Sequence, residues 1–246
     1  MKRTMARAEV EATTAGPGLS YPAAVPLPRY LEQTYWWAYL HPQGVRFFER
    51  QWLVNLILWG NYRKLRDAAL AAMGTPIDGK VLQVACVYGD LTEQLARRLH
   101  GAGRLDVVDV APVQLENLRR KIGPRPGVTL HHRDSTNLGF RDASYDRVIL
   151  FFLLHEQPDH ARARTVEEAL RVVRRGGKVI FVDYHRPARG NPFRYLMPPV
   201  LTLLEPFAMG LWLNDIASWL PSAVRPAVIE KRTYFGGLYQ KVVITR

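Results

Sequence analysis

The stretch VLQVACVYGDLT, from Val81 to Thr92, decides the fold of this chain. Its first four residues are typical of a buried strand, and a turn of small residues follows and ends at Gly89. The next residues, LTEQLARRL, have the apolar spacing of an amphipathic helix. A strand, a small-residue turn and a helix in this order are typical of the first unit of a doubly wound, nucleotide-binding α/β domain.

Strands and helices continue to alternate after this unit. We predict strands at residues 80–85, 104–108, 128–132, 147–152 and 177–183, and helices at residues 91–99, 112–122 and 161–173. Residues 189–224 are predicted to be an irregular insert, and residues 227–235 and 238–245 a final hairpin. This layout resembles the α/β, Rossmann-like fold of class I methyltransferases, with a mostly parallel sheet and a terminal antiparallel hairpin.

Composition divides the chain into three regions. Residues 1–28 are rich in Pro, Ala and Gly and are predicted to form a disordered tail. Residues 29–76 are predicted to form a helical cap rich in aromatic side chains, and residues 77–246 the α/β domain with its insert. With 246 residues, 48% of them hydrophobic, the chain is long enough to bury one sizeable core.

The net charge of +12, from 34 basic and 22 acidic residues, favours an anionic partner such as a phospholipid surface. We expect no nucleic-acid partner, because no RNA-binding module is visible. Cys86 is the only cysteine, which excludes an internal disulfide and favours a reducing compartment. We find neither a signal peptide nor an apolar stretch of transmembrane length, so a cytoplasmic protein is expected. The sequence does not indicate an oligomeric state.

Two aspartates follow strands where a nucleotide-like cofactor would bind. Asp109 follows the second predicted strand, about 20 residues after the turn, where an acid typically accepts hydrogen bonds from ribose hydroxyls. Asp134 follows the third strand, where methyltransferases contact the adenine of S-adenosylmethionine (SAM). The alternatives are that Asp109 caps the next helix and that Asp134 forms a turn or cap. The predicted cofactor site comprises Ala85, Cys86, Val87, Gly89, Asp109, Val110, Asp134 and Ser135.

Imidazole and carboxylate groups end the fourth and fifth strands. His155 and Glu156 follow the fourth strand, and Asp183 and His185 close the fifth. These strands are neighbours in this architecture, so their ends converge where a substrate would meet the cofactor. Such hard donors suit Mn²⁺ or Mg²⁺, and the four residues are predicted metal ligands. The alternative is that His155 is a hydrogen-bonded residue on the rim. We predict that Tyr88, His155 and Asp183 are catalytic.

The aromatic cap contains the run WLVNLILW at residues 52–59, which has Arg46 and Arg50 before it and Arg63, Lys64 and Arg66 after it. Apolar and aromatic residues flanked by cations are typical of a helix at a membrane interface. The alternative is a helix that covers the sheet and buries one face. We expect both to hold, with the protein peripheral at the inner face of the membrane and bound to anionic lipid.

Three segments carry a resemblance to a known family: VLQVACVYGDLT, RVVRRGGKVIFVDYHRP and NLILWGNYRKL. Together with the insert after the fifth strand, they resemble quinone-ring methyltransferases and, more closely, the rhodoquinone biosynthesis (RquA) proteins. The resemblance covers nearly the whole chain from about Tyr30. It implies that ubiquinone is converted into rhodoquinone, with an amine replacing a ring methoxy group, SAM as the nitrogen source and a manganese ion assisting.

The first loop departs from the methyltransferase pattern of an acid followed by small residues. Gln83 stands where the acid is expected, and Val87 replaces a central glycine. A Cβ at Val87 blocks close backbone approach, and the phenol of Tyr88 can donate a proton, so we predict that both set the type of reaction. The alternative is that both merely pack against the aromatic cap.

Two other functions stay open. One is a SAM-dependent C- or O-methyltransferase acting on a quinone or another lipophilic ring, and the altered loop argues against it. The other is a non-catalytic methyltransferase-fold module of a quinone-biosynthesis assembly. The presence of both Asp109 and Asp134 argues against this second alternative, because a decayed site has no need of both.

Overall fold

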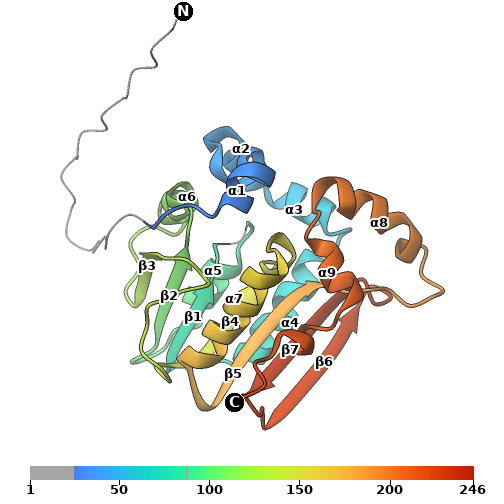
Figure 1. Ribbon diagram of the computed structural model, residues 1–246. Coiled ribbons are helices and arrows are strands. Elements are labelled where there is room, and N and C mark those ends of the chain that lie inside the picture. The colour runs from blue at the N-terminus through green and yellow to red at the C-terminus, as the bar shows by residue number, and fades with distance from the viewer. Residues whose placement is uncertain (1–24, 87) are drawn as a thin grey trace, which may run out of the picture.

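The protein is built on a seven-stranded sheet with helices on both faces (Figure 1). The computed structural model describes residues 25–86 and 88–246, so most of the predicted tail and Val87 lie outside the described residues. The strands are β1 (Lys80–Val84), β2 (Arg104–Asp109), β3 (Val128–His132), β4 (Tyr145–Phe151), β5 (Val173–Tyr184), β6 (Val228–Tyr234) and β7 (Tyr239–Thr245). Their order in the sheet is β3-β2-β1-β4-β5-β7-β6.

The first five strands run parallel and the last two antiparallel. β1 pairs with β2 and β4, β2 with β3, and β4 with β5, all in parallel. β7 runs antiparallel to β5 and to β6. The predicted fold class is therefore confirmed. After β3, at one edge of the sheet, the chain crosses β2 and β1 to form β4 on the other side of β1. The strand order therefore changes direction between β1 and β4, and at such a switch point the strand ends leave room for a ligand.

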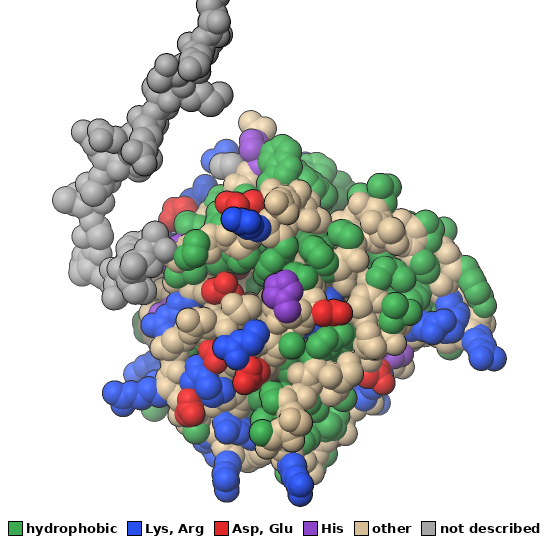
Figure 2. Space-filling model, viewed as in Figure 1, with side chains coloured by type: hydrophobic (Ala, Val, Ile, Leu, Met, Phe, Trp, Pro, Cys, Tyr) green, Lys and Arg blue, Asp and Glu red, His purple; other side chains and the backbone are tan. Residues whose placement is uncertain are grey.

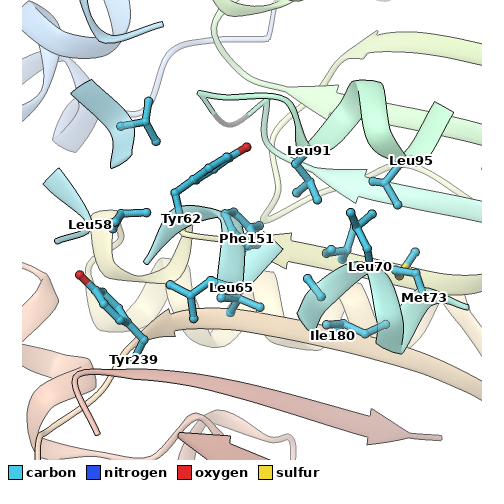
Figure 3. Packing of buried hydrophobic residues seen from close by; sticks show 14 of the residues in the cluster. Leu58, Tyr62, Leu65, Leu70, Met73, Leu91, Leu95, Phe151, Ile180 and Tyr239 are labelled. Atoms are coloured by element: carbon cyan, nitrogen blue, oxygen red, sulfur yellow. The ribbon is translucent and has the colours of Figure 1, made fainter. Parts of the chain in front are cut away.

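Helices cover both faces because the central strands are apolar on both sides. The helices on one face are α4 (Tyr62–Met73), α5 (Leu91–Ala96) and α6 (Pro112–Ile122), and α7 (Asp159–Val172) packs on the other. Figure 3 shows Leu65, Leu70 and Met73 of α4 beside Ile180 and Phe151 of the sheet, and all five are fully or almost fully buried. This packing fixes α4, and with it Tyr62 at the start of α4, against the strand ends.

Four short helices precede α4 and lie at the carboxyl ends of the strands (Figure 1). These roof helices are α1 (Arg29–Thr34), the π-helix η1 (Trp36–Leu40), α2 (Pro42–Phe48) and α3 (Gln51–Ile57). The helical character predicted for this part of the chain is confirmed. Glu49, at the end of α2, accepts a hydrogen bond of 2.8 Å from Asn117 and pairs with Lys121, so α2 is joined to α6.

The insert that was predicted to be irregular is helical. It contains α8 (Phe193–Leu204), α9 (Ala208–Leu213) and the 3-10 helix η3 (Ile216–Trp219). The prediction was wrong because Pro198 and Pro199 argued against a helix. Met197 and Leu201, four residues apart, both bury their side chains, and this packing holds α8 in spite of its prolines.

β5 begins earlier than predicted, at Val173. The RRGG segment, which precedes the predicted strand, lies within β5, and its backbone is hydrogen-bonded to Arg246. Gly176 donates a hydrogen bond of 2.7 Å to the carbonyl of Arg246, and Arg246 donates one of 3.1 Å to the carbonyl of Gly177. A tertiary contact with the last residue therefore decides this boundary, and no local pattern indicates it.

Gly89 provides a direct test of how α4 and the loop after β1 fit together. Its φ is +89°, and a Cβ at this position would lie 2.3 Å from the hydroxyl of Tyr62. That hydroxyl accepts a hydrogen bond of 2.7 Å from the backbone of Asp90 and donates one of 3.1 Å to its carboxylate. Gly89→Ala should therefore lower the free energy of unfolding by about 3 kcal/mol, from backbone strain and lost hydrogen bonds.

The matched control is Gly101→Ala. Gly101 also has a positive φ, of +56°, but nothing lies within 4 Å of a Cβ there, so only the backbone strain of about 1 kcal/mol should appear. Urea denaturation of the two variants measures the difference. Equal losses would show that Tyr62 does not restrict position 89.

Candidate functional site

A cavity lies where β1, β2 and β4 end, beneath the roof helices. Ala85, Cys86 and Tyr88 line it from the loop after β1, and Asp109 and Val110 line it from the end of β2. The roof and the segment after β4 supply further parts of the wall, including Trp37, Phe48, Ile57, Phe152, His155 and Glu156. Most of the predicted cofactor residues are therefore brought together, and Val87 lies outside the described residues.

Gln83 explains how the loop tolerates its unusual sequence. The Gln83 side chain is completely buried, and its amide donates a hydrogen bond of 3.0 Å to the carbonyl of Ala85. Ala85 has a φ of +75°, which favours glycine, so this bond holds a strained position. An ionised acid at position 83 could not donate to that carbonyl. Gln83, which stands in place of the usual acid, therefore stabilises the conformation of the loop after β1.

Asp109 projects a partly buried carboxyl group into the cavity. Its two oxygens accept hydrogen bonds of 2.7 Å from the amide of Cys86 and 2.8 Å from the amide of Ala111. Burial raises the pKa of Asp109 to about 6 and raises the pKa of the Cys86 thiol well above its usual range. Ala111, not Asp109, is the residue that caps α6. Each carboxylate oxygen can accept further hydrogen bonds, so Asp109 fits the ribose hydroxyls of SAM.

Asp134 and Ser135 face different cavities. One oxygen of Asp134 accepts hydrogen bonds of 2.8 and 2.9 Å from the amide and hydroxyl of Thr136, as in the turn alternative. Asp134 lines a separate cavity that also includes Pro158. Ser135 lines the main cavity, and its hydroxyl lies 2.9 Å from the side-chain amide of Gln157. The adenine contact of Asp134 stays a prediction.

His155 and Asp183 form a buried pair at the end of the cavity. The imidazole Nδ1 lies 2.9 Å from Oδ1 of Asp183, and burial and the carboxylate act on it in opposite directions. Burial favours the neutral ring, but Asp183 prevails and raises the pKa of His155 to about 9. The ring is therefore protonated at neutral pH. Its Nε2 lies 3.8 Å from Oε1 of Glu156.

The four predicted metal ligands do not form a metal site. Both oxygens of Asp183 are used by His155 and by the amides of Leu154, His155 and Tyr184. His185 turns away, with Nδ1 2.8 Å from the carbonyl of Gly237. Within residues 25–86 and 88–246, no three His, Cys, Asp or Glu side chains are placed to hold a metal ion. The predicted Mn²⁺ ligand set is therefore corrected, because internal hydrogen bonds take the donor atoms.

Tyr88 packs in the way that the alternative interpretation described. Its ring stacks on Phe48 of the roof, with centroids 6.1 Å apart. Its hydroxyl accepts a hydrogen bond of 3.0 Å from the side chain of Gln114 on α6. The ordinary pKa of a tyrosine is about 10, and burial raises the pKa of Tyr88 above that value. The phenol is therefore neutral in the physiological range. Its catalytic role stays a prediction.

Glu205 was not among the residues predicted for the site. It lies at the corner between α8 and α9, lines the main cavity, and has one carboxylate oxygen without a hydrogen-bond partner among the described residues. Burial raises its pKa, and the positive charge of His155 opposes this shift. The signal in the sequence was a single acid within the apolar run MPPVLTLLEPF. Because the insert was predicted to be irregular, the sequence did not indicate that Glu205 lines the same cavity as His155.

Aromatic rings form the wall next to His155. Phe152 has a φ of +55°, which is strained for a side chain of this size, and its ring lies 5.6 to 5.9 Å from those of Tyr184, Tyr239 and His155. Strain of this kind is concentrated at functional sites. The cavity therefore joins a polar end at Asp109 to an apolar end with one buried cation.

The sequence of this chain is similar to those of known methyltransferases. Residues 81–177 match the methyltransferase domain family. Demethylmenaquinone methyltransferase of Staphylococcus aureus (strain MRSA252) is 30% identical over 135 residues, which are 55% of this chain and 55% of that protein. The match thus spans about half the length of this relative.

Solved structures share the fold. The SAM-dependent methyltransferase from Aquifex aeolicus has a TM-score of 0.54 at 17% identity, and the match covers 83% of this chain and 98% of that one. The N-methyltransferase NodS from Bradyrhizobium japonicum, in complex with S-adenosyl-L-homocysteine, has a TM-score of 0.53 at 14% identity, covering 74% and 85%. These structures show that the chain has the fold of class I SAM-dependent methyltransferases. The match to the methyltransferase domain family is confined to residues 81–177, which are less than half of the chain.

The raised pKa of Asp109 predicts how SAM binding depends on pH. Hydroxyl donors favour the ionised carboxylate, so bound SAM should lower this pKa below about 6 and release a proton. Affinity should therefore rise about tenfold between pH 5 and pH 7. Isothermal titration calorimetry measures this change. Asp109→Asn should bind more weakly and without the pH dependence, and a flat profile for the wild-type protein would remove Asp109 from the site.

The His155–Asp183 pair predicts a pH dependence of stability. The folded-state pKa, about 9, lies above the ordinary value of 6.5, so the stabilisation is complete below pH 6.5 and is lost as pH rises through 9. The loss should be roughly 3 kcal/mol. Chemical denaturation from pH 6 to 10 should show this slope in the wild type and in His100→Gln, whose imidazole is exposed, but not in His155→Gln. A slope that survives in His155→Gln would contradict the assignment.

Proposed function

We propose that this protein transfers a group from SAM to the ring of a membrane-soluble quinone. One observation carries the proposal: a single cavity joins the loop after β1 and Asp109 to an aromatic wall beside protonated His155. The first end is where class I methyltransferases hold SAM. The rings of Phe152 and Tyr184 suit a planar, apolar substrate.

His155 has the placement of an acid catalyst in this proposal. Asp183 holds Nδ1–H, which leaves Nε2–H for a substrate in the cavity. A nucleophile that attacks a quinone ring places negative charge on a ring oxygen, and an imidazolium stabilises that charge by donating a hydrogen bond. Glu205 lines the same cavity and can accept a proton from the nucleophile.

Within this class, we propose amination of ubiquinone to rhodoquinone. Bound SAM would supply the nitrogen: its amine attacks the ring carbon that carries a methoxy group, a carbon–nitrogen bond forms, and the methoxy group leaves as methanol. Loss of the hydrogen on the donor carbon then turns its bond to nitrogen into an imine and passes two electrons to the ring. Water hydrolyses the imine to a 2-oxo acid and the aminated hydroquinone, which is the reduced form of rhodoquinone. The resemblance of VACVYGDLT to rhodoquinone biosynthesis proteins supports this choice. The Gln83 amide, which supports the altered loop in place of an acid, is consistent with it.

Methylation of a quinone is the second candidate. The observation in its favour is the 30% identity to a demethylmenaquinone methyltransferase. A non-catalytic module is less favoured, because His155 is buried, Asp109 is partly buried and both line a cavity, and ionisable groups in such places destabilise a fold that does not use them.

Product analysis separates the three functions. The protein is incubated with a short-chain ubiquinone and SAM labelled with ¹⁵N in its amine and ¹³C in its methyl group, with Mn²⁺ or with a chelator. We expect a product that has exchanged methoxy for labelled amine. A ¹³C-methyl product would establish the methyltransferase instead, and unchanged quinone in both conditions would favour the module. His155→Gln should lower turnover about 100-fold with SAM affinity retained, whereas His100→Gln should match the wild type.

A further inference from the structure

Two helices expose matching apolar stripes. In the roof, Trp52, Leu56 and Trp59 have exposed fractions of 59%, 63% and 45%. In the insert, Leu196, Val200 and Leu203 of α8 have exposed fractions of 52%, 38% and 80%. Trp52 and Leu56 have the spacing i, i+4 on α3, and Trp59 follows the end of that helix. Leu196, Val200 and Leu203 have the spacing i, i+4, i+7 and lie along one side of α8. We call these six residues the roof–insert face.

The two stripes lie at the same end of the molecule. Trp59 packs against Phe193, the first residue of α8, with ring centroids 4.7 Å apart. Figure 1 shows α3 and α8 side by side above the carboxyl ends of the strands, and Figure 2 shows hydrophobic side chains gathered over the same region. Segments far apart in the sequence thus form one apolar surface, and soluble monomers rarely expose large surfaces of this kind.

The main cavity opens within this part of the surface. Trp37 and Ile57 are 41% and 44% exposed, and both also line the cavity. Val54 and Leu58, on the inward side of the same run, are buried and line the cavity as well. A single helix therefore separates the cavity from the apolar surface, and the mouth lies at its edge.

Exposed cations lie in the same part of the chain as the residues at the mouth. Arg46, Arg50, Arg63 and Lys64 have exposed side chains in the roof helices and at the start of α4. The guanidinium of Arg50 lies over the ring of Phe47, 5.7 Å from its centroid. With a net charge of +12, two copies of the chain would repel each other, whereas an anionic lipid surface would attract this region.

We propose that the roof–insert face docks on an anionic lipid bilayer, and that the apolar tail of the substrate enters the cavity at Trp37 and Ile57. Docking would be interfacial: in the part of the chain that the structure describes, no helix is long and apolar enough to cross a bilayer. Apolar side chains would enter the headgroup layer while the cations contact lipid phosphates. The tail's path rests on the proposed function, but the docking does not.

Flotation with phospholipid vesicles tests the docking without SAM or quinone. We expect the full-length protein to float with phosphatidylglycerol-containing vesicles at low salt, and less at high salt or with phosphatidylcholine alone. The double variants Trp52→Ser/Leu56→Ser and Leu196→Ser/Leu203→Ser should each lower the partition coefficient at least tenfold. Circular dichroism checks that the variants remain folded.

The matched control is Val228→Ser/Ile229→Ser. These two residues are 48% and 43% exposed on β6, where they pair with Thr245 and Ile244 at the opposite end of the sheet from the roof. This variant should partition within twofold of the wild type. Wild-type protein that stays at the bottom of the gradient at low salt, or an equal loss in the control, would overturn the proposal.

A second copy of the chain is the alternative occupant of this face. Light scattering that shows a dimer, lost in the same double variants and without vesicle binding, would assign the face to self-association and overturn docking. These outcomes leave the proposed reaction untouched. Conversely, unchanged quinone in the product assay would remove the substrate's path while vesicle binding could stand.

Discussion

The buried carboxylate of Asp183 is the interaction on which the site depends. It is 1% exposed, and its two oxygens accept hydrogen bonds from the amides of Leu154, His155 and Tyr184 and from the His155 ring. A buried anion is stable only with such partners. Because Asp183 closes β5 and Leu154 and His155 follow β4, the same bonds that neutralise the charge also fix the cavity wall between these two strands.

A buried cation extends this arrangement to the insert. Arg162 is fully buried and donates hydrogen bonds of 2.9 Å to the carbonyl of Leu154 and 2.8 Å to that of Phe207. Leu154 is thus held by Asp183 through its amide and by Arg162 through its carbonyl. Glu205, two residues before Phe207, is positioned at the cavity by the same contact. The insert belongs to the site because these two buried ions hold the same turn after β4.

The sequence allowed the positions of the strand ends to be predicted, but not the bonds made there. Asp109 was placed correctly at the end of β2, because hydrophobic runs and loop length determine where a strand stops. Asp183 and His185 were expected to act together. The strand ends at Tyr184, so the alternation of side chains no longer applies to His185, which turns to the hairpin carbonyl of Gly237.

Long-range partners account for what the sequence could not reveal. Arg246 sets the start of β5 from the far end of the chain, and Met197 and Leu201 hold α8 despite two adjacent prolines. Glu205 shows the same limitation at the site itself, because its chemistry was visible but its distance from His155 depends on Arg162. The sequence shows which side chain stands at a position. Which hydrogen-bond or packing partner that side chain has is determined by how elements far apart in the chain pack together.

The run at residues 52–59 shows how two interpretations of one pattern can both apply. A helix that is apolar on all sides is expected to be buried on all sides. Here Val54 and Leu58 face the cavity, whereas Trp52 and Leu56 remain exposed. A helix that covers the sheet has to bury only its inward side chains. Its outward side chains do not have to be apolar. Packing within this chain therefore explains only the inward half of the run, and the exposed half is the part that the proposed docking on lipid would cover.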